Sequence, residues 1–421
     1  MVEHVIKTAK SLNPQKIIIV YGHQGEQLVS ALSHYSDLIF VEQKNQLGTG
    51  DAVRQALPEL QGVDHVLILC GDAPLVKAET LQAFIKLAES SNTDLSIVTA
   101  LAFPPTGLGR IVRDNRGHLK KIVEEKDATE EEKKITEFNT GIFWCSTQKL
   151  QEWLPKLTAE NTQKEFYLTD IISFALQEKQ QIPALLIEST TEALGCNDKK
   201  QLAVLERIYQ QQQADLLMQQ GVTLLDPARI DIRGEIKVGK DIEIDINVIL
   251  EGEVILEDEV KIGPNVIIKH STLQKGVEIL ANSVIENAII GPRTTVGPFS
   301  RIRPGTTLAE EVRIGNFVEI KNSQIGHGTK INHLSYVGDA TVGQKVNIGA
   351  GTITCNYDGK QKYRTIIEDE VFVGSDTQLI APVTVGEGVT IGAGTTIVKD
   401  VPSHHLIHNK VEHRCVLKKE T

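Results

Sequence analysis

An aliphatic residue at every sixth position is the feature of this sequence that most restricts its fold. After Pro227 two columns of such residues advance together, two positions apart. The first is Ile236, Ile242, Val248, Val254, Val260 and Val266, and the second is Val238, Ile244, Leu250, Leu256, Ile262 and Ile268. The same phase returns later at Val373, Leu379, Val385, Ile391 and Ile397. A period of six fits no α-helix, so the pattern predicts a parallel β-helix with one hexapeptide on each flat face.

Two interruptions break this repeat. An insertion shifts the frame between Arg303 and Arg313, and a polar loop leaves the coil near Cys355–Arg364. A β-helix that serves only as a structural or interaction module needs no such breaks, whereas loops on rigid scaffolds often carry function. Because the breaks are rich in His, Arg, Lys, Asn and Tyr, they favour an enzyme over a non-catalytic solenoid.

The first half of the chain alternates short apolar runs with helical patterns. The runs expected to be strands are Lys16–Gly22, Asp37–Gln43, His65–Asp72, Asp94–Ala100, Lys121–Glu125, Phe138–Cys145 and Ile182–Ile187. The first four are apolar nearly throughout, as expected for a parallel sheet covered on both faces. The expected helices are Gly25–Ser33, Gly50–Leu60, Ala78–Glu89 and Tyr167–Lys179. This succession predicts an α/β domain.

The domain boundaries follow from the change of pattern. At 421 residues, two domains are the default expectation. We expect an α/β domain over residues 1–197, a connector over 198–226 and the β-helix over 227–421. The connector contains a long helix, Asp198–Gly221, with glycine as its stop.

Composition and charge exclude several classes of function. The net charge of −11 argues against non-specific binding to nucleic acid or to an anionic membrane. Five scattered cysteines without a CxxC pair suggest neither a disulfide framework nor a zinc site, so a reducing cytoplasm fits best. No apolar run approaches the roughly 18 residues that a membrane span requires.

Motifs spread over almost the whole chain make it resemble a known family. They are QLGTGDAV (Gln46–Val53), CGDAPL (Cys70–Leu75), GLGRIV (Gly107–Val112), IVEEKDA (Ile122–Ala128), FNTGIF (Phe138–Phe143), YLTDII (Tyr167–Ile172), RIRPG (Arg301–Gly305), GNFVEIKNS (Gly315–Ser323), HLSYVGD (His333–Asp339), NIGAGTITCNYDG (Asn347–Gly359) and VFVGSDTQLIAPV (Val371–Val383). They resemble those of the bifunctional N-acetylglucosamine-1-phosphate uridylyltransferase / glucosamine-1-phosphate N-acetyltransferase family. The resemblance implies a Rossmann-like nucleotidyltransferase domain followed by a left-handed β-helix acetyltransferase domain. It also implies a cytoplasmic homotrimer that synthesises UDP-N-acetylglucosamine.

In the second half, the resemblance implies an acetyl-transfer site around His333. This histidine would be the base that deprotonates the C2 amine of glucosamine-1-phosphate, a task that suits an imidazole near neutral pH. Arg303 and Lys321 would bind the sugar phosphate, because a guanidinium and an ammonium together attract a dianion. The other implied sugar contacts are Tyr336, Asn347, Asn356 and Lys362. The implied contacts with the co-substrate acetyl-CoA are Ala350, Asn356, Tyr357, Ser375, Ala393 and Lys410.

In the first half, the resemblance implies a site for UTP and N-acetylglucosamine-1-phosphate. Asp72 ends a run expected to be a buried strand, at the sheet edge where ligands of α/β domains bind. Asp72 and Asn197 would hold Mg²⁺, which neutralises phosphate charge during nucleotidyl transfer. The positions that match uracil contacts are Gln43, Gly48 and Thr49, and those that match contacts with N-acetylglucosamine are Gly109, Glu124 and Asn139. Cys70 and Gly71, in the motif of Asp72, complete the candidates.

One departure from the family concerns the start of the sequence. The family opens with a strand and a glycine-rich loop that carries an arginine, followed by a lysine after a proline, and these do not occur here. The nucleotidyltransferase domain is therefore expected to be N-terminally incomplete and to transfer uridylyl groups poorly. The alternative is a sugar nucleotidyltransferase with a regulatory or structural β-helix, against which His333 and Asn356 speak.

Overall fold

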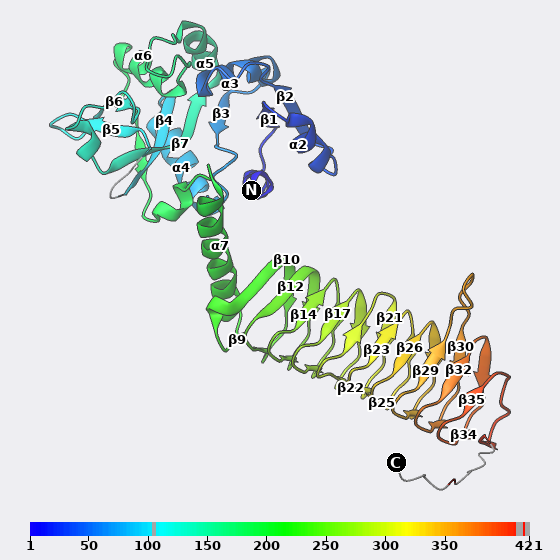
Figure 1. The fold of residues 1–421 in the computed structure, drawn as a ribbon. Helices are drawn as coiled ribbons and strands as arrows, with labels where there is room; N and C mark the ends of the chain where they lie inside the picture. The colour runs from blue at the N-terminus through cyan, green and yellow to red at the C-terminus, as the bar shows by residue number, and fades with distance from the viewer. Residues whose placement is uncertain (103–106, 410–415, 417–421) are drawn as a thin grey trace, which may run out of the picture. The chain divides into compact units, whose positions relative to one another are not determined.

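The structure is a computed structural model that describes residues 1–102, 107–409 and 416. It divides into two compact units, Met1–Ile208 and Tyr209–Thr421 (Figure 1). The division falls inside the long helix α7 (Lys199–Gln219), close to where the sequence predicted a helix. The finer boundaries at 197 and 226 stay a prediction.

The described residues of the first unit form two β-sheets. The strands β1 (Ile17–Tyr21) and β2 (Leu38–Glu42) form a two-stranded parallel sheet. The six-stranded sheet consists of β3 (His65–Ile68), β4 (Leu95–Leu101), β5 (Arg110–Arg113), β6 (Leu119–Val123), β7 (Glu137–Ser146) and β8 (Ala184–Leu186). In it β7 is antiparallel to both β3 and β4, whereas β4 and β8 are parallel. The expectation of a parallel sheet is therefore only partly met: β3 and β4 run in the same direction, but the antiparallel strand β7 pairs with both of them. An apolar run does not encode which strands pair with each other.

Helices cover both faces of the six-stranded sheet, as the apolar strands predicted. Alternate residues of β4 pack in different hydrophobic clusters, with Leu95 and Ile97 in one and Val98 and Ala100 in the other. Phe84 is fully buried in the second cluster. The helices of this unit are α1 (Val2–Ser11), α2 (Gly25–Ala31), α3 (Thr49–Ala56), α4 (Ala78–Ser91), α5 (Thr147–Trp153) and α6 (Ile171–Gln177). Among the described helices of the chain, none has the length and apolar character needed to cross a membrane.

The second unit is a parallel β-helix whose strands pair from one coil to the next. Two columns of strands form a 17-stranded sheet: β10 (Ile230–Val238), β12 (Val248–Leu256), β14 (Ile267–Lys269), β15 (Thr272–Leu273), β17 (Val284–Glu286), β18 (Ala288–Ile290), β20 (Arg301–Ile302), β21 (Thr306–Leu308), β23 (Glu319–Lys321), β24 (Gln324–Ile325), β26 (Tyr336–Gly338), β27 (Ala340–Val342), β29 (Ile353–Cys355), β30 (Thr365–Ile367), β32 (Gln378–Ile380), β33 (Val383–Val385) and β35 (Thr396–Ile397). The third column is an 11-stranded sheet: β9 (Thr223–Leu224), β11 (Glu243–Ile244), β13 (Lys261–Ile262), β16 (Glu278–Ile279), β19 (Thr295–Val296), β22 (Arg313–Asn316), β25 (Lys330–His333), β28 (Asn347–Ile348), β31 (Phe372–Val373), β34 (Thr390–Ile391) and β36 (Leu406–Ile407).

The predicted aliphatic columns form the core of this β-helix. From Ile242 to Ile268 every member of both columns is at most 2% exposed, and Ile236 and Val238 pack against them. The later set from Val373 to Ile397 is equally buried. A parallel β-helix is thus confirmed, whereas its left hand stays a prediction.

Residues with positive φ turn the chain at the corners of the coils. One corner, called here the His333 corner, has positive φ at Asn282, Phe299, Phe317, Leu334, Gly351, Asp376 and Gly394. Another, called the Asp339 corner, has positive φ at Gly252, His270, Asn287, Gly305, Asn322 and Asp339. Glycine, asparagine and aspartate adopt this conformation most readily, whereas bulky residues such as Phe317 rarely do.

Two further features frame the coils. The polar loop predicted near Cys355–Arg364 leaves the coil between β29 and β30 and is the orange projection in Figure 1. At the start of the stack, Gln210 of α7 makes two hydrogen bonds with the backbone of Ile232. Its Nε2 donates to the carbonyl oxygen at 2.9 Å, and its Oε1 accepts from the N–H at 2.7 Å. Ala214 and Leu217 of the same helix are buried in the β-helix core.

Candidate active site

His333 ends β25 at the His333 corner, and its imidazole is exposed. Its Nδ1 lies 3.1 Å from Oδ1 of Asn316, the residue paired with it in register on β22. Because an amide oxygen only accepts, the proton of the neutral imidazole belongs on Nδ1, which leaves Nε2 with a lone pair. Asn316 was not among the residues predicted from the sequence. Its position in the repeat could have identified it, because Asn316 stands directly before Phe317 just as His333 stands directly before Leu334.

Three of the candidate acetyl-CoA positions continue the same line. Five residues each stand immediately before a positive-φ residue of the His333 corner: Asn316, His333, Ala350, Ser375 and Ala393. Successive coils approach closely there, since a Cβ added to Gly349 would lie 2.6 Å from the nitrogen of Ser375. The structure therefore brings the histidine and these small residues into one strip.

Three further acetyl-CoA or sugar candidates lie on the same β-helix. Asn347 begins β28, on the coil that follows His333. Tyr357 and Lys362 are exposed and face each other across a β-bridge in the projecting loop. Lys410 lies outside the described residues.

The buried carboxylate of Asp339 joins several candidates. Its Oδ1 accepts a hydrogen bond from Nδ2 of Asn322 at 2.6 Å, and its Oδ2 accepts one from Nδ2 of Asn356. The ammonium of Lys321 lies 3.8 Å from Oδ2. Burial alone would raise the pKa of Asp339. The two hydrogen bonds and the positive charges of Lys321 and Lys362 outweigh burial, so this pKa lies below its usual value. This ionised acid holds the Nδ2 of Asn356 towards Asp339, so the amide oxygen of Asn356 faces the other way.

Four of the candidates for sugar binding share one face of the β-helix. Arg303, Lys321, Tyr336 and Asn356 lie on or directly after β20, β23, β26 and β29, which form one column of strands. Nη1 of Arg303 donates to Glu319 at 2.7 Å. Both cations expected to bind phosphate thus have a carboxylate partner, Glu319 or Asp339. Neither acid was among the residues predicted from the sequence.

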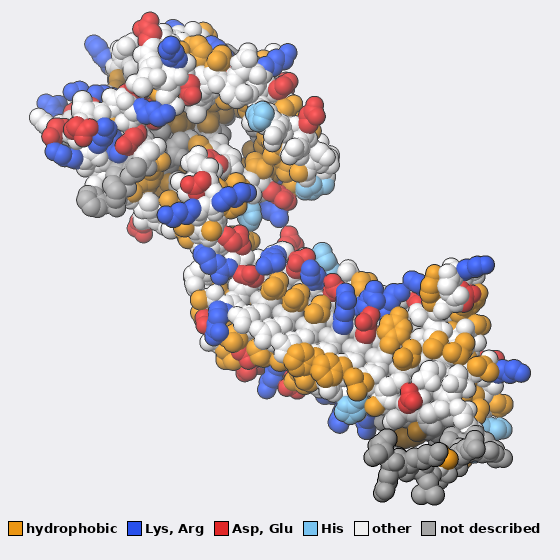
Figure 2. Space-filling model, in the orientation of Figure 1, with side chains coloured by type: hydrophobic (Ala, Val, Ile, Leu, Met, Phe, Trp, Pro, Cys, Tyr) orange, Lys and Arg blue, Asp and Glu red, His pale blue; other side chains and the backbone are white. Residues whose placement is uncertain are grey.

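Exposed apolar side chains follow the His333 corner. Phe299, Phe317 and Leu334 are 51%, 56% and 63% exposed, and the two rings stack with centroids 5.5 Å apart. Figure 2 shows hydrophobic side chains gathered over the visible face of the β-helix. Contiguous exposed apolar groups of this kind often mark an interaction surface.

In the first unit, Gln43, Gly48 and Thr49 come together at the start of α3. Nε2 of Gln43 donates to the carbonyl oxygen of Gly48 at 3.1 Å and to Oδ2 of Asp51 at 2.9 Å. Gly48 has a φ of 108°, and a Cβ there would lie 2.7 Å from the carbonyl oxygen of Phe166, so this position requires glycine. Asp51 was not among the residues predicted from the sequence.

Gly109, Glu124 and Asn139 also come together. A Cβ added to Gly109 would lie 3.3 Å from Oε2 of Glu124, and the N–H of Asn139 donates to the carbonyl oxygen of Gly109 at 2.8 Å. The hydroxyl of Thr169, in the YLTDII motif, donates to Oε1 of Glu124 at 3.1 Å. Burial raises the pKa of Glu124 above its usual value, and the nearby carboxylate of Asp170 adds to this effect.

Asp72 approaches the segment that carries Asn197. A Cβ added to Gly195 would lie 3.0 Å from Oδ2 of Asp72. Carboxylate and amide oxygens suit Mg²⁺, which completes its coordination with water and substrate phosphate. Within the described part of the chain, no three His, Cys, Asp or Glu residues are grouped so as to hold a metal. The carboxylate of Asp72 thus lies close to the backbone two residues before Asn197.

Cys70 and Gly71 lie between β3 and Asp72. The Sγ atom of Cys70 is 3.7 Å from the carbonyl oxygen of Gly141. Burial, with the charge of Asp72, raises the pKa of Cys70 to about 11. Cys70 is thus a neutral thiol at pH 7, which suits packing against Gly141 better than nucleophilic attack.

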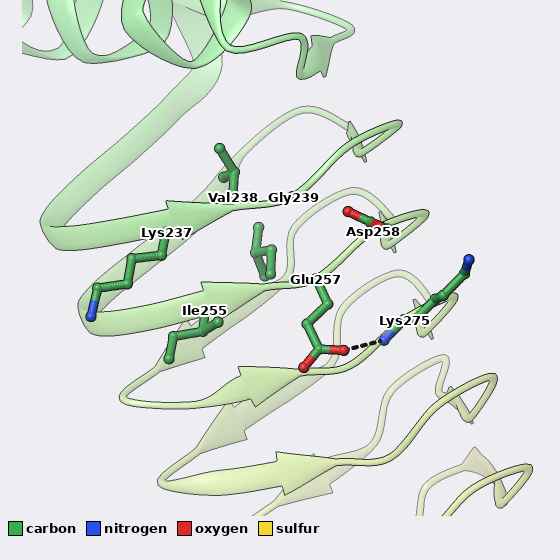
Figure 3. Close-up of a pocket in the computed structure, with 8 residues that line it drawn as sticks. Lys237, Val238, Gly239, Ile255, Glu257, Asp258 and Lys275 are labelled. Carbon is green, nitrogen blue, oxygen red and sulfur yellow. Dashed lines mark hydrogen bonds between the residues drawn. The ribbon is translucent and has the colours of Figure 1, made fainter.

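A shallow hollow on the first coils contains none of the candidates. Figure 3 shows its lining, which includes Lys237, Ile255 and Asp258. The backbone N–H of Lys275 donates to Oε2 of Glu257 at 3.0 Å. The hollow is a groove between coils, and we assign no function to it.

The chain is similar to known proteins along nearly its whole length. It is 54% identical over 403 residues to the bifunctional protein GlmU of Methylococcus capsulatus, which covers 96% of this chain and 87% of the relative. It is 50% identical over 410 residues to that of Burkholderia vietnamiensis, with 97% and 90% covered. It is also 50% identical over 409 residues to that of Acinetobacter baumannii, with 97% and 89% covered.

Three domain families match separate parts of the chain. The MobA-like NTP transferase domain matches residues 1–134 in the first unit. The GMPPB C-terminal domain matches residues 232–316, and the bacterial transferase hexapeptide (six repeats) matches residues 364–399. The last two matches fall on the β-helix.

Proposed function

The chain belongs to the family of bifunctional GlmU proteins, and on that premise we propose how its two units divide the synthesis of UDP-N-acetylglucosamine. The enzyme is both an acetyltransferase and a uridylyltransferase. We assign acetyl transfer from acetyl-CoA to glucosamine-1-phosphate to the His333 corner. Uridylyl transfer from UTP to N-acetylglucosamine-1-phosphate is assigned to the first unit. The observation that carries the first assignment is the pairing of His333 with Asn316.

His333 acts as the base of acetyl transfer. Its Nδ1–H donates to Asn316, so Nε2 accepts a proton from the C2 amine of the sugar. The amine nitrogen forms a bond to the carbonyl carbon of the thioester, and the carbon–sulfur bond breaks. His333 then returns the proton to the departing sulfur, which leaves as the thiol of CoA.

The face beside His333 binds the sugar phosphate. Arg303 and Lys321 supply two positive charges for the dianion, and their acid partners hold both side chains in place before it binds. The remaining sugar contacts are Tyr336, Asn347, Asn356 and Lys362. The strip of small residues Ala350, Ser375 and Ala393 lets acetyl-CoA lie close to the coil, with Tyr357, Asn356 and Lys410 as further contacts.

The working form is a cytoplasmic homotrimer, with this site between chains. One flat face cannot surround a small substrate, so a second copy supplies the opposite wall. The exposed side chains of Phe299, Phe317 and Leu334 support this arrangement, because they stand next to the candidate site and a partner would bury them.

The first unit binds the uridine nucleotide and the acetylated sugar. Gln43, Gly48 and Thr49 contact uracil, and Gly109, Glu124 and Asn139 hold N-acetylglucosamine. Asp72 and Asn197 hold Mg²⁺, which when bound neutralises the charge of the reacting phosphates. The described geometry supports these groups as two clusters, one at the start of α3 and one around Glu124.

Replacement of His333 tests the assignment of acetyl transfer. The His333→Ala variant should lose roughly 10²–10⁴ in rate, measured as thiol release from acetyl-CoA with glucosamine-1-phosphate. The matched control is His327→Ala, a partly exposed histidine on the same β-helix that lies near the carboxylates of Glu310 and Glu311. A rate of thiol release in His333→Ala that lies within threefold of the rate in the control would contradict the proposal.

A further inference from the structure

The carboxyl ends of β1 and β2 carry an unusual buried amide. Gln43 directly follows β2, and its backbone N–H donates to the carbonyl oxygen of Tyr21 at 2.7 Å. Its side chain is nearly buried, being 8% exposed. Ligands of α/β domains bind beyond the carboxyl ends of parallel strands, so this amide stands where a ligand is expected.

Both hydrogen-bond partners of this amide are acceptors. Nε2 of Gln43 donates to the carbonyl oxygen of Gly48 and to Oδ2 of Asp51. A carboxylate cannot donate, so the amide nitrogen must face Asp51 and the amide oxygen must face away. Among the described residues no group donates to Oε1 of Gln43, and that oxygen is not sealed from solvent.

Asp51 is itself held in one orientation. Its side chain is 4% exposed, and its Oδ1 accepts from Arg54 at 2.5 Å and from Nε2 of Gln55 at 3.2 Å. Burial alone would raise the pKa of Asp51. The hydrogen bonds from Gln43 and Arg54 outweigh burial, so this pKa lies below its usual value. At neutral pH both oxygens therefore remain acceptors, one for Arg54 and Gln55 and the other for Gln43.

We propose that Asp51 is a specificity-determining residue, which fixes the Gln43 amide so that its oxygen accepts a hydrogen bond from the imide N–H of a uracil base. This inference rests on the proposed role of Gln43 in uracil binding. Uracil presents an N–H at position 3, whereas cytosine presents a lone pair there, which the amide oxygen would repel. Asp51 does not contact the base and acts only through Gln43.

The Asp51→Asn substitution replaces one carboxylate oxygen, an acceptor, by an amide nitrogen, a donor, and keeps the size of the side chain. Arg54 and Gln55 are donors, so they retain the amide oxygen of the new side chain as their acceptor. The amide nitrogen of the new side chain then faces Gln43. Because this nitrogen is a donor, it attracts the Gln43 oxygen, which would otherwise face the base. The Gln43 amide then adopts both orientations. Uracil and cytosine therefore each face its oxygen in some molecules and its nitrogen in others.

The test is calorimetric titration of the full chain with UDP and with CDP, in Mg²⁺. Wild-type protein should bind UDP about 10- to 100-fold more tightly than CDP, because a mismatched buried acceptor is costly. The Asp51→Asn variant should lower this ratio to within about threefold of one. The matched control is Arg54→Met, which removes the ion pair but keeps the carboxylate facing Gln43, and it should keep the wild-type ratio.

Each outcome either supports or overturns the inference about Asp51. A lower ratio in Asp51→Asn alone supports the inference, whereas an equal loss of affinity for both nucleotides would show a merely structural role and overturn it. Wild-type protein without preference for UDP would overturn both the inference and the uracil-binding role of Gln43. Thermal unfolding checks the fold of each variant. If Asp51→Asn does not fold, the smaller Asp51→Ser variant serves, and a preserved ratio there overturns the inference.

Discussion

The Nδ1 atom of His333 and the Oδ1 atom of Asn316 lie 3.1 Å apart, although one coil of 17 residues separates them in sequence. Parallel pairing between β22 and β25 holds the two side chains in register. Asn316 therefore selects the tautomer of the imidazole in which Nε2 carries the lone pair. A base needs this form, and the pair has direct consequences for kinetics.

Asn316→Ala should reduce kcat for acetyl transfer about tenfold to a hundredfold, because His333 loses the acceptor that orients it. The KM for acetyl-CoA should change little. In Asn316→Asp, the added carboxylate stabilises the protonated imidazole, so the rate profile should move to higher pH. Steady-state kinetics from pH 6 to 9 would measure both effects, and an unshifted profile in Asn316→Asp would contradict the assigned contact.

Asp339→Asn should raise the KM for glucosamine-1-phosphate about tenfold, because Asn356 and Lys321 lose their ionised partner. It should also lower the free energy of unfolding by about 1–3 kcal/mol. The pKa of Asp339 lies below its usual value in the folded protein. Its stabilisation is thus present above the carboxyl pKa of the unfolded chain and is lost as pH falls through the folded pKa.

The control for Asp339 is Asp369→Asn. Asp369 lies on the same β-helix and accepts a hydrogen bond from the backbone of Gln344, and within the described part of the chain its side chain makes no hydrogen bond or ion pair with a candidate residue. Urea unfolding at several pH values, together with KM measurements, compares the two variants. Equal KM values in the two variants would show that Asp339 does not position Asn356.

Glu124→Gln should stabilise the first unit near neutral pH while weakening the binding of N-acetylglucosamine. The folded pKa of Glu124 is raised by burial, so its ionised form is costly above that pKa. The gain from glutamine should shrink as pH falls through the raised pKa and vanish below the unfolded value. Calorimetric unfolding from pH 4 to 8 measures this, and a gain that grows towards acid pH would contradict the assigned direction.

Phe317→Asp should dissociate the proposed trimer, because it places a charge in the middle of the apolar row along the His333 corner. The matched control is Ile289→Asp, whose side chain is 47% exposed on another face of the β-helix. Sedimentation of both variants and of the parent protein reads out the oligomeric state. A trimer that survives in Phe317→Asp as it does in the control would place the interface elsewhere.

The repeat was readable from the sequence because its packing is local. Val248 and Val254 follow each other at the period that brings both into the core, so their burial needed no knowledge of the rest of the chain. The partners of the site residues were not readable in this way. Asn316 and His333, or Asp339 and Asn356, meet only across coils, and coil length here varies with insertions.

The first unit shows the same limit in another form. Apolar runs predicted β3 and β4, but the antiparallel strand β7 between them depends on a connection that no local pattern describes. The role of Asp51 was likewise hidden, because a sequence does not show which way a neighbouring amide points. Resemblance to a family supplied the candidate residues, and the structure supplied the groups that orient them.

The two hydrogen bonds between Gln210 and Ile232 bear on whether the β-helices of separate molecules can stack end to end. The first coil of a parallel stack exposes backbone groups that the coil of another molecule could use, as at the edge of any sheet. The carboxamide of Gln210 mimics a peptide unit and occupies both groups of Ile232. A single side chain in the glutamine run thus acts as a terminal rung, and at this point end-to-end growth into fibres has no place to begin.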